Sequence, residues 1–105
     1  MPSRLRKISP ARGRPRGSTS FSAEVAQTYG DIVREARVAA GISQEALAHM
    51  ADLERSYFGR IERGKSQPTL FVMLKISTAL AVESAVLVEM VEQELRKRRR
   101  ASMQV

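Results

Sequence analysis

Apolar residues recur at spacings of three and four along most of this chain, which is the period of a helix with one buried face. The first such pattern predicts a helix over residues 22–40, ending at Gly41, which suits the left-handed conformation after a helix. No segment alternates polar and apolar residues over a useful length, so we predict an all-α fold. The inward positions of this first helix are Val25, Tyr29, Ile32, Val33, Ala36 and Ala40.

Two short helices follow Gly41. Ser43 can cap the first, because its hydroxyl accepts a free backbone N–H. Asp52 lies in the turn between them, where a short polar side chain tolerates a positive φ. The second covers residues 54–63 and ends at Gly64, with Glu54 as a weaker cap than Ser or Thr. The expected buried positions of the pair are Ala46, Leu47, Met50, Leu53, Ile61 and either Tyr57 or Phe58.

Two further helices are predicted over residues 69–80 and 83–98. The last carries an apolar stripe that continues beyond what a small core needs. From Met90 onward we expect little in the same chain to bury it. The helix end is then either frayed in a monomer or covered by a second copy, and we favour a symmetric dimer. The predicted dimer interface is Val86, Met90, Val91 and Leu95.

Charged residues are distributed unevenly along the 105-residue chain, whose net charge is +7. Residues 1–20 contain six Lys or Arg and no acid, with three of the four prolines, and are predicted to be disordered when free. Residues 96–100 are all basic, whereas residues 21–95 contain seven Lys or Arg against eleven Asp or Glu. Basic tails either bind a polyanion, meaning nucleic acid or an anionic membrane surface, or merely aid solubility. The predicted organisation is a tail at 1–20, a compact domain at 21–82, a helix at 83–100 and a short tail at 101–105.

Several classes of function lack support in the sequence. Without cysteine there is no disulfide framework and no thiolate metal site, and His49 is the single histidine. No nucleophile has a histidine partner signature, and there is no phosphate-cradling glycine loop. No apolar run approaches the ~18 to 20 residues of a membrane span, and no secretory signal is evident. We therefore expect no enzyme activity, cofactor, small-molecule ligand or membrane association, and a cytoplasmic location.

Residues 41–64 resemble the helix-turn-helix of the Cro/phage-repressor type, also called the XRE-like family. The resemblance extends over about residues 25–82. It implies an all-α, five-helix, lambda-repressor-like domain whose third helix enters the DNA major groove. Asp52 and Glu54 depart from the family, which often has Gly and then Ser or Thr there. The matching pieces are Gly41-Ile42-Ser43-Gln44-Glu45-Ala46-Leu47-Ala48, Tyr57-Phe58-Gly59-Arg60-Ile61-Glu62-Arg63-Gly64-Lys65, Pro68-Thr69-Leu70 and residues 74–80.

The resemblance also implies roles for single residues. The base readers would be Arg55, Ser56 and Arg60, with Glu54 adding a contact or a filter. Gln44 would grip the DNA backbone or an adjacent base. Tyr57 could contact DNA or pack in the core. The predicted phosphate contacts are Arg63, Lys65 and Ser66. Arg37 and Glu62 would form a partly buried ion pair with a structural role.

The N-terminal segment contains a second motif. Arg12-Gly13-Arg14-Pro15 resembles the core of an AT-hook, in which an extended Arg-Gly-Arg lies in the narrow minor groove of A·T tracts. The other interpretation is a generic electrostatic tail.

Taken together, these features predict a sequence-specific transcriptional regulator, a repressor in our interpretation. It would bind a palindromic operator in double-stranded DNA as a homodimer. The alternative is an antitoxin or adaptor that binds DNA for autoregulation and uses its long C-terminal helix to hold a protein partner.

Overall fold

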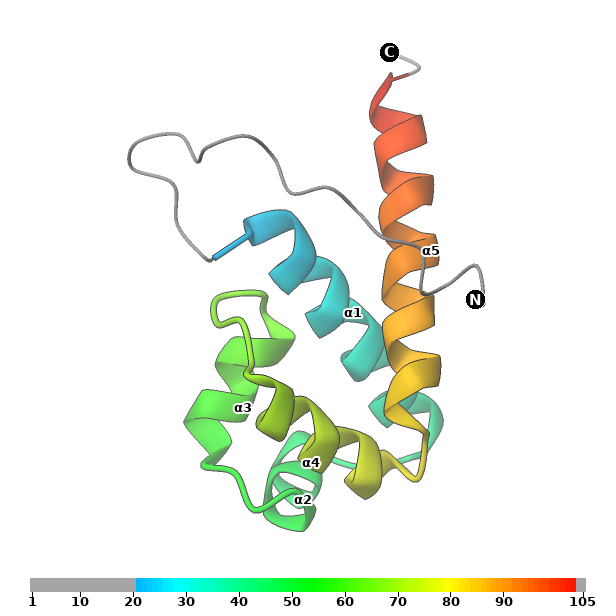
Figure 1. Ribbon diagram of the computed structural model, residues 1–105. Coiled ribbons are helices and arrows are strands. Elements are labelled where there is room, and N and C mark those ends of the chain that lie inside the picture. The colour runs from blue at the N-terminus through cyan, green and yellow to red at the C-terminus, as the bar shows by residue number, and fades with distance from the viewer. Residues whose placement is uncertain (1–20, 104–105) are drawn as a thin grey trace.

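The computed structural model describes residues 21–103, and these residues form five helices and no strand. They are α1 (Ala23–Ala39), α2 (Gln44–Met50), α3 (Arg55–Glu62), α4 (Leu70–Leu80) and α5 (Ser84–Met103). α1 and α5 lie side by side, while α2, α3 and α4 form the lower part of the molecule (Figure 1). The predicted all-α fold is confirmed. The AT-hook-like residues Arg12 to Pro15 lie outside the described residues.

Local hydrogen bonds explain where three of the helices begin. The hydroxyls of Ser22, Ser43 and Thr69 each accept the backbone N–H three residues further on, at 3.3, 3.0 and 3.2 Å. Each bond satisfies one of the free N–H groups at a helix start. Glu54 makes no such bond at the start of α3, as expected for a weaker cap. Asp52 has a φ of 54°, so the predicted turn between α2 and α3 is confirmed.

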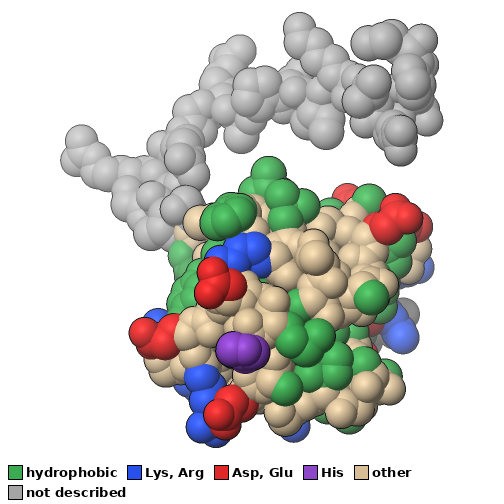
Figure 2. Space-filling model, turned by 90° about the horizontal axis from the view of Figure 1, so that it is seen from below, with side chains coloured by type: hydrophobic (Ala, Val, Ile, Leu, Met, Phe, Trp, Pro, Cys, Tyr) green, Lys and Arg blue, Asp and Glu red, His purple; other side chains and the backbone are tan. Residues whose placement is uncertain are grey.

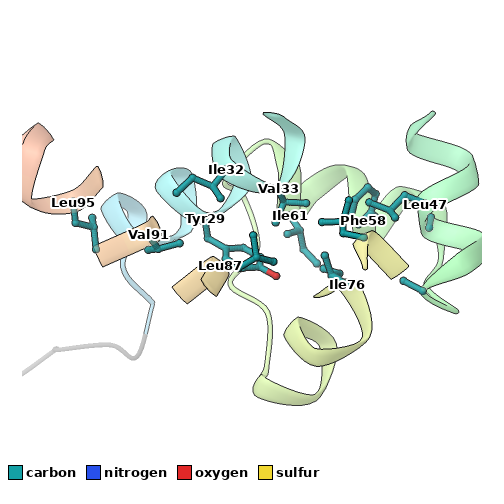
Figure 3. Packing of buried hydrophobic residues seen from close by; sticks show 13 residues of the cluster. Tyr29, Ile32, Val33, Leu47, Phe58, Ile61, Ile76, Leu87, Val91 and Leu95 are labelled. Carbon is teal, nitrogen blue, oxygen red and sulfur yellow. The ribbon is translucent and has the colours of Figure 1, made fainter. Parts of the chain in front are cut away.

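All five helices contribute to one core (Figure 3). Phe58 is fully buried while Tyr57 is half-buried, so Phe58 is the core residue at this point of α3. Two predicted core positions of α2 are wrong, because Ala46 and Met50 are exposed. The largest fully buried side chains are Phe58, Leu47, Ile61, Ile76, Leu87, Val33 and Thr28.

Two glycines allow α1 to approach the end of α3 closely. A Cβ on Gly30 would lie 2.4 Å from the carbonyl oxygen of Ile61. A Cβ on Gly64, which has a φ of +73°, would lie 2.6 Å from Oε1 of Gln27. Gly30 therefore offsets its low helix propensity by letting the two backbones touch. This contact fixes the end of α3 against α1.

The structure corrects half of the predicted dimer interface. Val91 and Leu95 are only 8% and 9% exposed and belong to the core of their own chain. Val86 and Met90 are 46% and 41% exposed. The sequence pattern did not show that α1 runs beside α5 and covers this half of the stripe (Figure 1). The last helix thus contributes one side to the core of its own chain, leaves Val86 and Met90 exposed, and continues to Met103.

Candidate nucleic-acid interface

The outward side of α3 presents the three predicted base readers. Arg55, Ser56 and Arg60 are all exposed. The Arg60 guanidinium lies over the Tyr57 ring, 5.7 Å from its centre, and the two side chains form a cation–π contact. Ser56 donates its hydroxyl hydrogen to the Glu54 carboxylate. The polar groups at the start of α3 are therefore partly ordered before any partner binds.

Arg55 has a weak internal partner. Its Nη1 lies 3.6 Å from Oε2 of Glu45 on α2, and both side chains are more than two-thirds exposed. Exposed pairs of this kind contribute about 1 kcal/mol or less. Arg55 can therefore leave Glu45 for a stronger acceptor at little cost.

The expected ion pair between Arg37 and Glu62 is present and almost fully buried. Arg37 Nε donates to Glu62 Oε2 at 2.7 Å, and Nη2 donates to Oε1 at 3.1 Å. Arg37 Nη1 also donates to the carbonyl of Ile42 at 2.8 Å. Gln44 donates its amide to Glu62 Oε1 at 2.9 Å. The network joins α1, the start of α2 and the end of α3, and it occupies the Gln44 amide that was expected to grip DNA.

A basic hollow of about 750 Å³ lies beside this network. Arg63 and Lys65, which were predicted to contact phosphates, line it, whereas Ser66 does not. Arg34 on α1 also lines it and was missed from the sequence, where it stands on the polar side of the first helix far from the motif. Within residues 21–103, no ion pair engages Arg34, Arg63 or Lys65. The residues lining the basic hollow are Gln27, Asp31, Arg34, Arg37, Gln44, Glu62, Arg63 and Lys65.

Some of the basic side chains at residues 96–100 form ion pairs within the chain. Arg99 donates from Nε and Nη2 to the two oxygens of Glu24, at 3.0 and 2.8 Å. This hydrogen bonding from Arg99 lowers the pKa of the Glu24 carboxyl below its usual value. Arg98 is also engaged by acids, on α1 and α5. Two of the five basic residues at 96–100 therefore hold α5 on α1.

Other kinds of site find no support in the part of the chain that the structure describes. Residues 21–103 contain no group of three or more His, Cys, Asp or Glu side chains placed to hold a metal ion. No single helix among them has both the length and the apolar composition of a membrane span. α4 and α5 reach that composition only as a pair, bent by 106° at the break between them.

The fold and site define a helix-turn-helix module with an exposed cationic second helix. The family model described as "Helix-turn-helix" matches residues 33–87, and the chain belongs to this family, in its Cro/phage-repressor (XRE-like) type. The transcriptional regulator ClgR of Mycobacterium tuberculosis is 32% identical over 82 residues, covering 77% of this chain and 73% of ClgR. The control protein C.BamHI of Bacillus amyloliquefaciens is 43% identical over 56 residues, covering 52% of this chain and 69% of that protein.

Solved structures agree with this assignment. The restriction-modification controller protein C.AhdI of Aeromonas hydrophila superposes with a TM-score of 0.58 at 44% identity, covering 59% of this chain and 94% of C.AhdI. The controller protein C.Esp1396I, solved as a tetramer with its natural 35-base-pair operator, has a TM-score of 0.63 at 28% identity. That match covers 68% of this chain and 93% of the controller protein.

Proposed function

We propose that this protein is a sequence-specific DNA-binding transcriptional regulator that inserts α3 into the major groove. The observation that carries the proposal is the exposed row of Arg55, Ser56 and Arg60 on α3, next to the basic hollow. A helix fits the major groove with its N-terminal residues at the base edges. The relatives named as transcriptional regulators and controller proteins support this reading.

Base reading and backbone binding fall to different residues. Arg55 and Arg60 can each bond O6 and N7 of a guanine, for about 1–3 kcal/mol of discrimination. Arg34, Arg63 and Lys65 face the hollow and would bind phosphates, which positions the protein without reading sequence. The basic residues of the 1–20 segment would add affinity that falls steeply with salt, and Arg12 to Pro15 would reach the minor groove.

The protein would bind its operator as a dimer. Exposed hydrophobic side chains remain on the outside of α4 and α5, beyond the core, and such patches often mark protein interfaces. Figure 2 shows hydrophobic side chains gathered on the lower face of the molecule. A two-fold dimer would place two copies of α3 about 34 Å apart, in successive major grooves. The exposed residues proposed for the interface are Val86 and Met90, which lie four residues apart on one face of α5.

A regulator of this kind needs no cofactor and no catalytic chemistry, and it would act in the cytoplasm at the bacterial nucleoid. Repression follows if the operator overlaps a promoter. In the antitoxin or adaptor alternative, α5 would hold a protein partner, but Leu87, Val91 and Leu95 of this helix are buried in their own chain. Val86 and Met90 remain available for a second copy or another protein.

Footprinting on bacterial genomic DNA tests the proposal. The full chain should protect a small number of discrete sites, each with half-sites about one helical turn apart. The matched control is the Arg55→Ala/Arg60→Ala protein, which keeps the basic hollow and should bind DNA without discrete sites. Uniform protection by the unaltered protein, indistinguishable from the control, would contradict sequence-specific regulation.

A further inference from the structure

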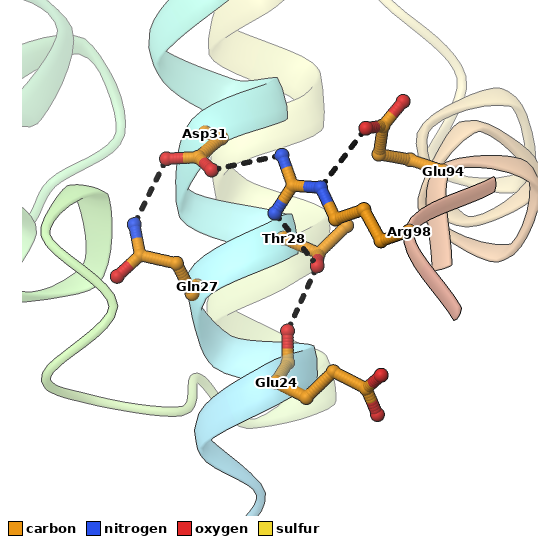
Figure 4. Close-up of polar contacts among 6 residues, drawn as sticks. All are labelled: Glu24, Gln27, Thr28, Asp31, Glu94 and Arg98. Carbon is orange, nitrogen blue, oxygen red and sulfur yellow. Dashed lines mark hydrogen bonds and ion pairs between the residues drawn. The ribbon is translucent and has the colours of Figure 1, made fainter. Parts of the chain in front are cut away.

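Arg98 of α5 reaches an acidic residue at the edge of the basic hollow (Figure 4). Its Nη2 donates to Asp31 Oδ2 at 3.0 Å. Its Nη1 donates to Thr28 Oγ1 at 3.1 Å, and its Nε donates to Glu94 Oε2 at 2.9 Å. The guanidinium is therefore fixed on three sides. Asp31 lines the hollow, whereas Arg98 does not.

The other oxygen of Asp31 is also engaged. Gln27 Nε2 donates to Asp31 Oδ1 at 2.9 Å, as Figure 4 shows. Gln27 lines the hollow and lies tightly against Gly64, where an added Cβ would come within 2.8 Å of the Gln27 Cα. Gly64 directly precedes Lys65. A continuous set of contacts thus runs from Arg98 through Asp31 and Gln27 to the segment that carries a predicted phosphate contact.

The charges of the hollow follow the same arrangement. It contains two acids, Glu62 and Asp31, among four cationic side chains. Glu62 is neutralised by Arg37 from within the hollow, and Asp31 by Arg98 from behind it. A carboxylate without a cation here would repel a phosphate, because like charges placed close together are costly when partly shielded from water. The hollow therefore attracts an anion more strongly when both acids are paired than when Asp31 lacks its cation.

We propose that Arg98 is a positioning residue for DNA phosphate binding, acting through Asp31 without touching the DNA. It neutralises Asp31 and holds Gln27 against the segment before Lys65. The inference rests on the proposed function, because it concerns how the same surface binds the DNA backbone.

The chain offers a matched control for this idea. Arg99 is also in α5, also donates to a carboxylate of α1, and carries the same charge, but its partner Glu24 does not line the hollow. Arg98→Ala and Arg99→Ala therefore remove equal charge and one helix-to-helix ion pair each. Only the first leaves a carboxylate of the hollow, that of Asp31, without its cationic partner and with the Gln27 amide alone.

The test is fluorescence anisotropy with a labelled 30-base-pair duplex of mixed sequence at low salt, since phosphate contacts do not depend on sequence. Arg98→Ala should raise Kd about tenfold, and Arg99→Ala about threefold or less. In an Asp31→Asn background, Arg98→Ala should cost no more than Arg99→Ala, because the repulsive charge is gone. Circular dichroism of each variant checks that the helices remain.

Two results would overturn the inference. Equal losses for Arg98→Ala and Arg99→Ala would mean that only total charge matters. An undiminished loss in the Asp31→Asn background would mean that Arg98 itself contacts DNA or only supports the fold. If the unaltered protein bound no DNA, the proposed function would fail separately. The same variants titrated with pyrophosphate, with the amide shift of Lys65 as readout, would then decide whether Arg98 controls anion binding.

Discussion

Arg37 and Glu62 come from helices α1 and α3 and form a two-point ion pair, with Nε to Oε2 at 2.7 Å and Nη2 to Oε1 at 3.1 Å. The side chains are 12% and 2% exposed. Removing Arg37 would leave the Glu62 carboxylate buried with only the Gln44 amide as a partner. We expect Arg37→Ala to lower the free energy of unfolding by about 3 kcal/mol, measured by urea denaturation.

The control for that measurement is Arg34→Ala, three residues earlier on the same helix and exposed. It should change the free energy of unfolding by about 0.5 kcal/mol or less. Similar values for the two variants would show that the buried pair is not special to the fold.

The two glycines inside helices should respond to alanine in opposite ways. Gly30→Ala places a Cβ 2.4 Å from the Ile61 carbonyl oxygen, which is backbone and cannot move aside. We expect a loss of about 1–3 kcal/mol, despite the better helix propensity of alanine. At Gly59 the nearest atom to an added Cβ is the flexible end of Arg63, at 3.1 Å. Gly59→Ala should therefore be neutral or stabilising by up to about 1 kcal/mol in thermal unfolding. Equal destabilisation at both positions would refute the close approach of α1 and α3.

The Arg99–Glu24 contact predicts a pH dependence at the α1–α5 contact. Hydrogen bonding from Arg99 lowers the pKa of Glu24 in the folded protein. A lowered carboxyl pKa contributes stability above the unfolded value of 4.5, and this is lost as pH falls through the folded pKa. NMR titration should show Glu24 titrating below its ordinary range, and returning to that range in Arg99→Gln. Arg96→Gln, in the same basic run, should leave the Glu24 pKa unchanged.

The positions of α2 and α3 could be predicted from the sequence because their signals are local. Ser43, Asp52 and Gly64 act on their own backbone, so residue type alone indicates where a helix starts or ends. The buried Arg37–Glu62 pair joins residues far apart in the chain. Residue type and spacing alone do not indicate this pair, and only the family resemblance implies it.

What could not be predicted depends on how helices pack. Val91 and Leu95 continue a stripe that also contains Val86 and Met90, and nothing in the pattern shows that α1 covers only one half of it. Arg34 and Asp31 likewise enter the site only because α1 lies against the end of α3. The period of apolar residues predicts which side of a helix is buried. It does not predict which other helix packs against that side, because this depends on the whole fold.

Met90 and Val91 are neighbours in α5, but the first is exposed and the second is buried, so the same substitution should affect them differently. Met90→Asp, at an exposed position, should leave the helices intact but shift the protein toward its 11.7 kDa monomer in analytical ultracentrifugation. Val91→Asp would bury a charge in the core and should prevent folding, which circular dichroism would show. A Met90→Asp protein with unchanged mass in solution would argue against a dimer through this face.

The most direct test of the central claim is selection of bound sequences from random DNA, performed with the unaltered protein, Arg60→Ala, Arg55→Ala and Arg34→Ala. If α3 reads the operator, Arg55→Ala and Arg60→Ala should each lose base preference at particular positions, by about 1–3 kcal/mol per position. Arg34→Ala should weaken binding evenly while keeping the same consensus, because phosphate contacts carry no sequence information. An unchanged consensus for both α3 variants would contradict the account.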